Sequence, residues 1–475
     1  MDLKGSREIL SNVRYLQNIR PIDPEEIEEY ISGSVGVDLI KSEIRDNAFR
    51  LGLVERFDGK FTPVSEDPIG PRVVEVLKIP EKYSARLEDI LREKYGKEWQ
   101  LGESGEIIRE RIRGIKKDYY EGRGVEYDEE NALAYAAYHF PGYYVAIQHI
   151  LNKISEGGLL KRKLRILDVG AGIGGPALGI SDYIPENALV EYNAVEPSKA
   201  ADILQILMEE RGANVHLNIH RETAEKFEPS GVYDIVLFAN VISELENPIS
   251  VVNKYSKFVS KTGAMILVAP ADKNTAIELR EVERAISSNM NIYVPAISLW
   301  PGQVPCSECW SFEVMPDIEI PSFQEKIDRG GQRKGEFVNI DVQVAYSILR
   351  WDSQTLFRHP GDISRCVKLS DIGTRIGKRV DIIVVKLSQD LSEGQNSLFL
   401  VGDGSEKIDN YIVIVKETPQ NRVMAEAEYG RIVLIRDVLV LWNEDETSYN
   451  LIVDKETTVQ QGLKGSGGDK SSDTK

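Results

Sequence analysis

The chain has 475 residues, 42% of them hydrophobic and 28% charged, which predicts a globular protein of several domains rather than one hydrophobic core. Its formal net charge of −18 argues against a surface that binds polyanions throughout, although a local basic face stays open. Because the sequence has no run of about 18 apolar residues, no signal-peptide pattern at its start and only three cysteines, we expect a cytoplasmic protein without a membrane span or a disulfide framework.

Residues 1–65 predict a winged-helix-like domain. Asp23 caps a helix with Pro24 at its first position, and a second helix with apolar residues at helical spacing follows. Residues 53–57 and 60–64 predict short strands joined by the turn Asp58-Gly59. Helices closed by such a hairpin bind either nucleic acid or protein, and the sequence leaves both open.

Residues 66–130 predict a helical connector with charged surfaces. Cations interleave with tyrosines in its second half, in the set Arg109, Arg111, Arg113, Lys116, Lys117, Tyr119, Tyr120 and Arg123. Cations suit phosphates and aromatic rings suit bases, so this set is a candidate RNA-facing strip. The alternative, which we favour, is a solvated helix face.

The rest of the chain predicts two further domains and a tail. Strands alternate with helices over residues 131–360, which predicts an α/β domain with a parallel, doubly wound sheet. Residues 361–461 predict a small OB-type β-barrel, with a helix at 421–429 before its fourth strand. Five strands are expected there, at 380–387, 397–401, 411–415, 431–442 and 449–453. Residues 462–475 predict a disordered tail.

A glycine-rich turn follows the first strand of the α/β domain. The strand runs into Asp168, and then come Gly170, Gly172 and Gly174. Glycines let the backbone pass close to a ligand, but nucleotide-binding folds share such loops, so the signal alone is weak. An acid before the first glycine suits a cationic sulfonium ligand with an amino-acid tail, whose ammonium Asp168 would help to hold through ordered water.

Residues at the ends of later strands narrow the choice of ligand. Glu196 ends the second strand, at the spacing from Gly172 that suits hydrogen bonds from a ribose diol. Asn240 follows the fourth strand and should reach the ligand edge of the sheet, while Thr223 and Ala224 should flank an adenine. Together these residues predict an S-adenosylmethionine pocket in a Rossmann-like class I methyltransferase core, rather than a dinucleotide site.

Three stretches carry a resemblance to a known family. Residues 134–146 (AYAAYHFPGYYVA), 240–245 (NVISEL) and 267–270 (LVAP) resemble the mitochondrial ribosomal small-subunit methyltransferase-like proteins and their archaeal relatives. The resemblance covers about residues 130–355, and neither end domain contributes to it. It implies association with the small ribosomal subunit or its rRNA during assembly or translation. It also implies that methyl transfer is weak or absent, since such proteins can act as assembly factors.

The same resemblance implies an iron–sulfur centre. Cys306 and Cys309 match the paired cysteines of the family, whereas Ser311 stands where another ligand is expected. Cys366 would be a distant third thiolate, and a closed iron–sulfur or zinc site needs a fourth ligand, such as Glu308. The alternative is two loop thiols and one buried apolar cysteine, and the sequence leaves both open.

The sequence does not assign a catalytic residue. Asn240 could hydrogen-bond a target amine and Glu244 could act as a base, or both could only shape the loop. We predict an S-adenosylmethionine-binding protein that acts on or with the small ribosomal subunit. The alternatives are a small-molecule methyltransferase whose end domains are lids or dimerisation modules, and a non-catalytic ribosome or RNA binder that retains the cofactor pocket.

Overall fold

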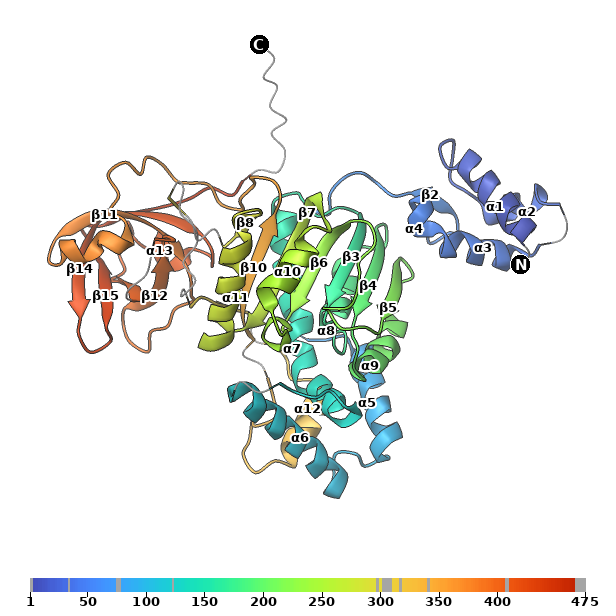
Figure 1. Cartoon of the computed structure of the whole chain (residues 1–475), viewed down its shortest axis with the longest axis horizontal. Coiled ribbons are helices and arrows are strands. Elements are labelled where there is room, and N and C mark those ends of the chain that lie inside the picture. Colours follow the sequence, from blue (N-terminus) through green and yellow to red (C-terminus); the bar gives the residue numbers. More distant parts are fainter. Residues whose placement is uncertain are drawn as a thin grey trace, which may run out of the picture.

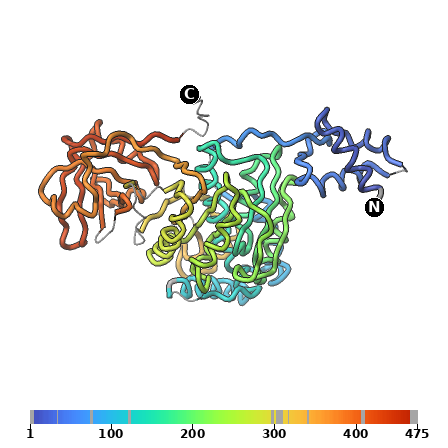
Figure 2. The backbone as a smooth tube through the Cα atoms, turned by 45° about the horizontal axis from the view of Figure 1, so that its top comes forward, coloured from blue at the N-terminus to red at the C-terminus, as the bar shows by residue number. Residues whose placement is uncertain are grey.

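The computed structural model describes residues 3–32, 35–73, 78–121, 124–295, 299–300, 310–315, 318–339, 342–405 and 410–465. These residues form an N-terminal module, a central α/β domain and a C-terminal barrel. The module and the barrel lie on opposite sides of the central domain (Figures 1 and 2). Within this part of the chain, every helix is too short or too polar to cross a membrane.

The N-terminal module consists of helices followed by a hairpin. Its helices are α1 (Leu3–Leu16), α2 (Pro24–Glu29), α3 (Val37–Asp46) and α4 (Ala48–Leu51), and its strands are β1 (Leu53–Glu55) and β2 (Phe61–Pro63). Asp23 caps α2 by accepting a hydrogen bond from the Glu25 amide, as predicted. The predicted second helix is interrupted at Asn47, and the backbone of Ile22 pairs with Phe61 beside the hairpin. The assignment of a winged helix stays a prediction.

The central domain is built on one mixed sheet of the predicted doubly wound kind. Its strands are β3 (Lys163–Val169), β4 (Leu189–Val195), β5 (Val215–His220), β6 (Tyr233–Ala239), β7 (Val259–Pro270), β8 (Asn291–Val294), β9 (Glu313–Val314) and β10 (Gln343–Arg350). The order is β5-β4-β3-β6-β7-β10-β8, and β9 pairs with β10. Strands β3 to β7 run parallel, whereas β10 is antiparallel to both of its neighbours β7 and β8.

Helices cover both faces of this sheet (Figure 1). Alternate strand residues point to opposite faces, so Ile166 and Leu167 join two different hydrophobic cores. One core packs against α7 (Glu129–Glu156), α8 (Gly175–Tyr183) and α9 (Ala200–Leu207), with the 3₁₀ turn η1 (Met208–Glu210) after α9. The other core packs against α10 (Pro248–Ser256) and α11 (Lys273–Ile286).

The segment predicted as a connector packs against the central domain. Its helices are α5 (Glu81–Tyr95) and α6 (Gly102–Tyr120), and the later helix α12 (Ser322–Arg329) joins them. Buried residues of all three, such as Leu87, Ile112 and Phe323, share one hydrophobic core with α7. The helices α5 and α6 therefore enlarge the central domain and help to fix the position of α7.

Most of the described cations of α6 are paired within the protein, some with Glu106 of α6 itself and others with neighbouring segments. The contacts are Arg109 with Glu106, Arg111 with Glu130, Arg113 with Glu106 and Glu336, and Lys116 with the Glu336 carbonyl oxygen and the Tyr138 ring. Lys117 is exposed, and Arg123 lies outside the described residues. The pairs with Glu130 and Glu336 hold α6 against its neighbours and give the RNA-facing strip no support, so the strip stays a prediction. Arg111 and Lys117 keep the solvent exposure that the alternative expects.

The C-terminal domain is a closed barrel of five strands, as predicted. They are β11 (Arg379–Lys386), β12 (Ser397–Gly402), β13 (Asn410–Val415), β14 (Ile432–Asn443) and β15 (Ser448–Val453), in the order β11-β12-β13-β15-β14, with β11 pairing again with β14. The 3₁₀ helix η3 (Leu369–Arg375) precedes the barrel. The inserted helix α13 (Val423–Glu426) is shorter than predicted, and β16 (Thr458–Gln461), which pairs with β14, was not predicted.

A buried polar network joins the barrel to the central domain. Arg280 and Glu283 of α11 form an ion pair with both side chains 0% exposed. Arg280 also donates hydrogen bonds to Ser311 at 2.8 Å and to the Tyr429 hydroxyl at 3.3 Å, just before β14. This network fixes the orientation of the two domains, and it gives Ser311 a structural role.

The beginning of the predicted disordered tail is ordered. The Gly462 amide donates to the Ile432 carbonyl oxygen, and Lys464 forms ion pairs with Glu156 and Glu428. Residues 466–475 lie outside the described part of the chain. The ordered chain therefore continues to about residue 465, because these contacts tie it to the barrel and to α7.

Candidate cofactor-binding site

A cavity of about 290 Å³ lies at the carboxyl ends of the central strands. Six of the eight predicted cofactor residues line it, namely Gly170, Gly172, Glu196, Thr223, Ala224 and Asn240. The other two, Asp168 and Gly174, are outside the lining. Parallel strands bring their carboxyl ends to one edge of a sheet, which is why residues far apart in sequence meet here.

The glycine loop is shaped by backbone conformations that favour glycine. Gly170, Gly172 and Gly174 have φ angles of +72°, +53° and +87°. A Cβ atom at Gly170 would lie 2.4 Å from the Val241 side chain, so that glycine is required by packing. A Cβ at Gly172 would meet no atom within 4 Å, although this glycine lines the cavity. The space at Gly172 is therefore open to a ligand.

Glu196 closes the loop and still has acceptor capacity. Its carboxylate accepts hydrogen bonds from the amides of Gly172 and Ser198, each at 2.9 Å. A carboxylate has about four lone-pair sites, so two amides do not saturate it. Glu196 can therefore accept hydrogen bonds from ribose hydroxyls, as the sequence predicted, while it also shapes the glycine turn.

Asp168 lies fully buried beneath the loop. Its Oδ2 atom accepts a hydrogen bond of 2.6 Å from the Tyr192 hydroxyl, whereas its Oδ1 atom has no hydrogen-bond partner among the described residues. Burial raises the pKa of Asp168 to about 7. Buried polar atoms are normally hydrogen-bonded, so the free oxygen calls for a donor such as a ligand ammonium or a bridging water.

Asn240 has the same kind of unsatisfied acceptor. Its φ is +58°, which is uncommon for a residue other than glycine, and its side-chain Oδ1 atom is buried with no partner in the described part of the chain. Its backbone amide donates to the Val268 carbonyl oxygen at 2.9 Å, which anchors the turn after β6. The residue is thus held in a strained conformation at the cavity wall, as is common at ligand sites.

A further part of the lining comes from α7 and from the 3₁₀ turn η2 (Ile242–Glu244). Tyr127 and Tyr135 line the cavity together with Glu244, whose Oε1 accepts hydrogen bonds of 3.3 Å from the hydroxyls of Tyr119 and Tyr127. The surrounding protein raises the pKa of Glu244 to about 7, although its side chain stays accessible. The sequence singled out Glu244 and the tyrosine-rich stretch, but it did not place Tyr127 in the site.

The charges around the cavity fit a cationic ligand. Glu196, Glu225 and Glu244 line it, whereas no lysine, arginine or histidine is among the described residues of the lining. S-adenosylmethionine carries a sulfonium and an ammonium, so this set of carboxylates matches its charge. Together with the open space at Gly172, the chemistry of the residues fits this cofactor.

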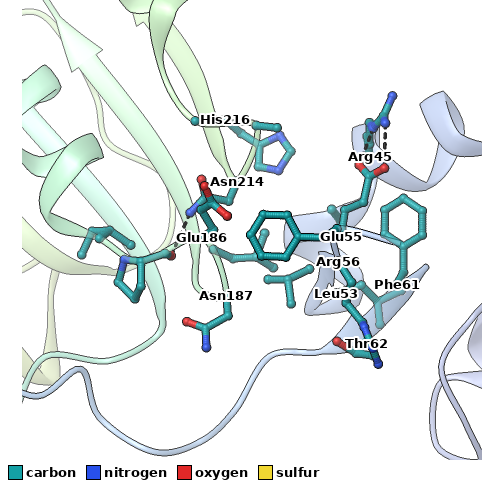
Figure 3. A pocket seen from close by; sticks show the side chains of 18 of the residues that line it. Arg45, Leu53, Glu55, Arg56, Phe61, Thr62, Glu186, Asn187, Asn214 and His216 are labelled. Atoms are coloured by element: carbon teal, nitrogen blue, oxygen red, sulfur yellow. Dashed lines mark hydrogen bonds and ion pairs between the residues drawn. The ribbon is translucent and has the colours of Figure 1, made fainter. Parts of the chain in front are cut away.

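A larger hollow of about 960 Å³ lies between the N-terminal hairpin and the central domain (Figure 3). Its walls mix both signs of charge, and one of its cations, Arg45, forms an ion pair with Glu55 at 2.6 Å. His216 faces it from the central domain (Figure 3). The hollow lacks the glycine loop of residues 170–174 and the carboxylates of the smaller cavity, so it does not fit the cofactor.

The predicted metal site gains no support from the described side chains. Cys306 and Cys309 lie outside the described residues, as does Glu308. Cys366 is a half-buried free thiol, and burial raises its pKa to about 11, which favours the thiol over the thiolate that binds metals. In the described ranges, no group of three histidine, cysteine or carboxylate side chains gathers as metal ligands would. The metal site stays a prediction.

Comparison with protein families identifies the central domain. A family model described as a methyltransferase domain matches residues 139–314. Models for the N-terminal and C-terminal domains of a domain of unknown function (DUF8157) match residues 6–57 and 370–462. No curated protein matches the chain.

Several solved structures are similar to the chain at low identity. A plantazolicin methyltransferase in complex with SAH is 14% identical, with a TM-score of 0.32, and the match covers 51% of this chain and 98% of that one. A putative methyltransferase from Thermoplasma acidophilum is 16% identical, with a TM-score of 0.27 and coverages of 40% and 70%. A putative class I S-adenosylmethionine-dependent methyltransferase from Listeria monocytogenes is 11% identical, with a TM-score of 0.33 and coverages of 57% and 88%.

The family match and the sheet order agree on the fold. The matched residues span the glycine loop, most of the cavity lining and most of the sheet. The central domain therefore has the fold of the S-adenosylmethionine-dependent methyltransferases, as the sequence predicted. The match is to this broad domain family, and the narrower ribosomal family suggested by the resemblance stays a prediction.

Proposed function

We propose that this methyltransferase domain binds S-adenosylmethionine in the 290 Å³ cavity and transfers its methyl group to an acceptor. One observation carries the proposal. Open space at Gly172, the carboxylate of Glu196 and the unpartnered oxygen of Asn240 surround the cavity, with the free oxygen of Asp168 buried beneath the loop. Buried acceptors are normally hydrogen-bonded, so these two oxygens fit donors supplied by a ligand or by a bridging water.

Each residue has a distinct task in this proposal. Bound S-adenosylmethionine would supply an activated methyl group on a sulfonium. Glu196 would accept hydrogen bonds from the ribose hydroxyls, and Thr223 and Ala224 would flank the adenine. Asp168 and Asn240 would hold the amino-acid tail, either directly or through water. The protein contributes mainly by aligning the acceptor with the methyl group, which is the chief requirement for this kind of transfer.

Calorimetric binding of S-adenosylmethionine to two arginine variants tests the cofactor site. In Gly172→Arg the side chain fills the open space of the loop, so binding should disappear. Gly102→Arg is a matched control: Gly102 has a φ of +55°, close to the +53° of Gly172, and a Cβ there also meets no atom within 4 Å. Both variants carry the same backbone strain, but Gly102 lies outside the cavity lining.

The two variants separate loss of the site from loss of the fold. We expect Gly102→Arg to bind S-adenosylmethionine like the wild type, and Gly172→Arg to stay folded without binding. Unchanged affinity in a folded Gly172→Arg protein would disprove the assignment of the cavity.

We further propose the small ribosomal subunit or its rRNA as the target of this domain. The support is the resemblance of residues 134–146, 240–245 and 267–270, together with the presence of two end domains. The cations of α6 no longer support it, because they bind within the protein. Co-sedimentation of the full chain with purified small subunits over a salt series tests this target, and absence of the protein from the subunit fraction at low salt would contradict it.

A small-molecule acceptor is the second candidate. It is favoured by the acidic lining of the cavity, because three carboxylates without a described cation repel a phosphate backbone. Transfer of a labelled methyl group to a small-molecule fraction of a cell extract, but not to RNA or ribosomes, would favour this candidate.

A further inference from the structure

We propose that the acceptor is an amine nitrogen, recognised by the rings of Tyr127 and Tyr135 and by the carboxylate of Glu244. This inference rests on the proposed methyl transfer and names its substrate class. It holds for either kind of target, a macromolecule that presents an amine or a small amine.

The three side chains come from separate segments and meet at the cofactor cavity. Tyr127 precedes α7, Tyr135 lies one turn and a half into α7, and Glu244 ends η2. The rings of Tyr127 and Tyr135 are 5.4 Å apart and nearly perpendicular, at 87°. The Tyr127 hydroxyl donates to Glu244 at 3.3 Å. An aromatic corner with a carboxylate at its edge therefore faces the same space as Gly172 and Glu196.

Neighbouring side chains hold this corner in place. The hydroxyls of Tyr119 and Tyr127 share a hydrogen bond, and the Tyr119 hydroxyl also lies 3.3 Å from Glu244, so α6 is tied to η2 through the corner. On its other side, Tyr135 packs against His139 at 4.6 Å and against Tyr143 at 6.4 Å. Burial lowers the pKa of His139 to about 3, so this ring is neutral and adds no positive charge behind Tyr135.

The chemistry of the corner selects for a cation. Aromatic faces attract ammonium groups, and a carboxylate accepts their N–H hydrogen bonds more strongly than it accepts neutral donors. Carboxylate and phosphate acceptors are repelled, because Glu196, Glu225 and Glu244 line the cavity and no described lining residue is cationic. A hydroxyl acceptor would gain no charge attraction from this arrangement. Among the common methyl acceptors, an amine is the one that uses both the aromatic rings and the carboxylate of Glu244.

Glu244 also suits the proton balance of the reaction. An ammonium must lose a proton before its nitrogen has a lone pair to react, and Glu244 can take that proton. The nitrogen then forms the new N–C bond as the methyl carbon–sulfur bond breaks towards sulfur, which leaves a neutral thioether. The protein around Glu244 raises its pKa to about 7, which brings it closer to the pKa of an ammonium than an ordinary carboxylate and makes the proton transfer less unfavourable.

Binding of simple probes to the SAH complex of the full chain tests the inference without requiring turnover. The probes are n-butylamine, 1-butanol and butyrate, which differ in charge but hardly in size, and their dissociation constants are measured by NMR titration at pH 7.5. The variants Glu244→Gln and Tyr127→Leu remove the carboxylate charge and one ring. Glu246→Gln is the matched control, because Glu246 is an exposed carboxylate two residues along the chain and outside the cavity lining.

The expected result is a charge preference that depends on the corner. The protonated amine should bind at least about 10-fold more tightly than 1-butanol, and butyrate should bind most weakly. Glu244→Gln and Tyr127→Leu should each remove most of this preference, while Glu246→Gln should keep it. Equal binding of the three probes by the wild type, or a preference that survives in both folded corner variants, would overturn the inference.

Failure of the inference differs from failure of the proposed function. SAH binding is measured first, and its absence in the wild type would remove the cofactor site itself. Normal SAH binding with no amine preference would leave methyl transfer intact and disprove only the amine acceptor.

Discussion

Arg280→Met should destabilise the protein strongly, because Arg280 is the cation of a buried ion pair. The side chains of Arg280 and Glu283 are both 0% exposed. Methionine has a similar length and preserves much of the packing, but it leaves the Glu283 carboxylate without its charge partner. Removing one member of a buried ion pair typically costs about 3–5 kcal/mol. The same substitution removes the hydrogen bonds of Arg280 to Ser311 and Tyr429, which hold the barrel.

The cost should depend on pH in a defined direction. Burial already raises the pKa of Glu283, and the nearby Arg280 lowers it, so loss of the arginine raises that pKa further. The folded variant then binds a proton that the unfolded chain releases, which means that the free energy of unfolding falls as pH rises above about 4.5. The slope approaches about 1.4 kcal/mol per pH unit for one group. The variant should therefore be less stable at about pH 8 than at about pH 5.5, relative to the wild type.

Urea unfolding at the two pH values measures the cost, and hydrogen exchange of β10 and β11 shows whether the joint between the domains opens first. Arg329→Met is the control, because Arg329 is 77% exposed and its ion pair with Glu325 should contribute less than about 1 kcal/mol. The double variant Arg280→Met/Glu283→Met removes both charges, so it should recover much of the loss. A single variant no less stable than Arg329→Met, or a double variant no better than Arg280→Met, would refute the reasoning.

Three further predictions concern the cofactor site and α6. Glu196→Ala should weaken calorimetric S-adenosylmethionine binding by about 1–3 kcal/mol, since a buried acceptor for the ribose is lost; unchanged affinity would contradict this role. Because burial raises the pKa of Asp168 to about 7, cofactor affinity should rise from about pH 6 to pH 7.5 as its carboxylate ionises, and Asp168→Asn should reduce that rise to the part that Glu244 supplies. Arg113→Glu should lower the free energy of unfolding in urea by roughly 1 kcal/mol or more, because it replaces the ion pairs with Glu106 and Glu336 by repulsion. Lys117→Glu on the exposed side is the control and should leave that free energy unchanged. Equal stability of the two variants would count against the ion pairs of Arg113.

The barrel shows which strands can be predicted from the local sequence pattern alone. Its five closing strands are short runs rich in apolar and β-branched residues, and each was predicted to within two residues of its observed ends. The strand β16 was not predicted because its sequence, Thr-Val-Gln-Gln, is short, polar and partly exposed, so it has no apolar stripe. Only its pairing with β14 makes it a strand.

The residues of the cofactor site likewise divide into those that a local sequence pattern predicts and those that only the packing reveals. Gly170, Gly172 and Glu196 were predicted because loop glycines and strand-end acids form a local signal that follows each strand. Tyr127 was missed because it lies before α7, in a segment without a motif, and it reaches the cavity only through the packing of α6 and α7. The sequence named Glu244 without assigning it a role, since that role depends on which rings surround it.

The sequence by itself determined the doubly wound sheet, the C-terminal barrel and the residues of the glycine loop, because these follow from hydrophobic periodicity and from backbone conformations that only glycine adopts easily. Only the tertiary structure decided how the charged residues are used. Arg113 pairs with Glu336, 223 positions away, and Arg280 reaches Tyr429 across 149 positions. A cation looks the same in the sequence whether it faces water, a phosphate or a buried carboxylate, since its partner is chosen by the packing of distant segments and not by its neighbours in the chain.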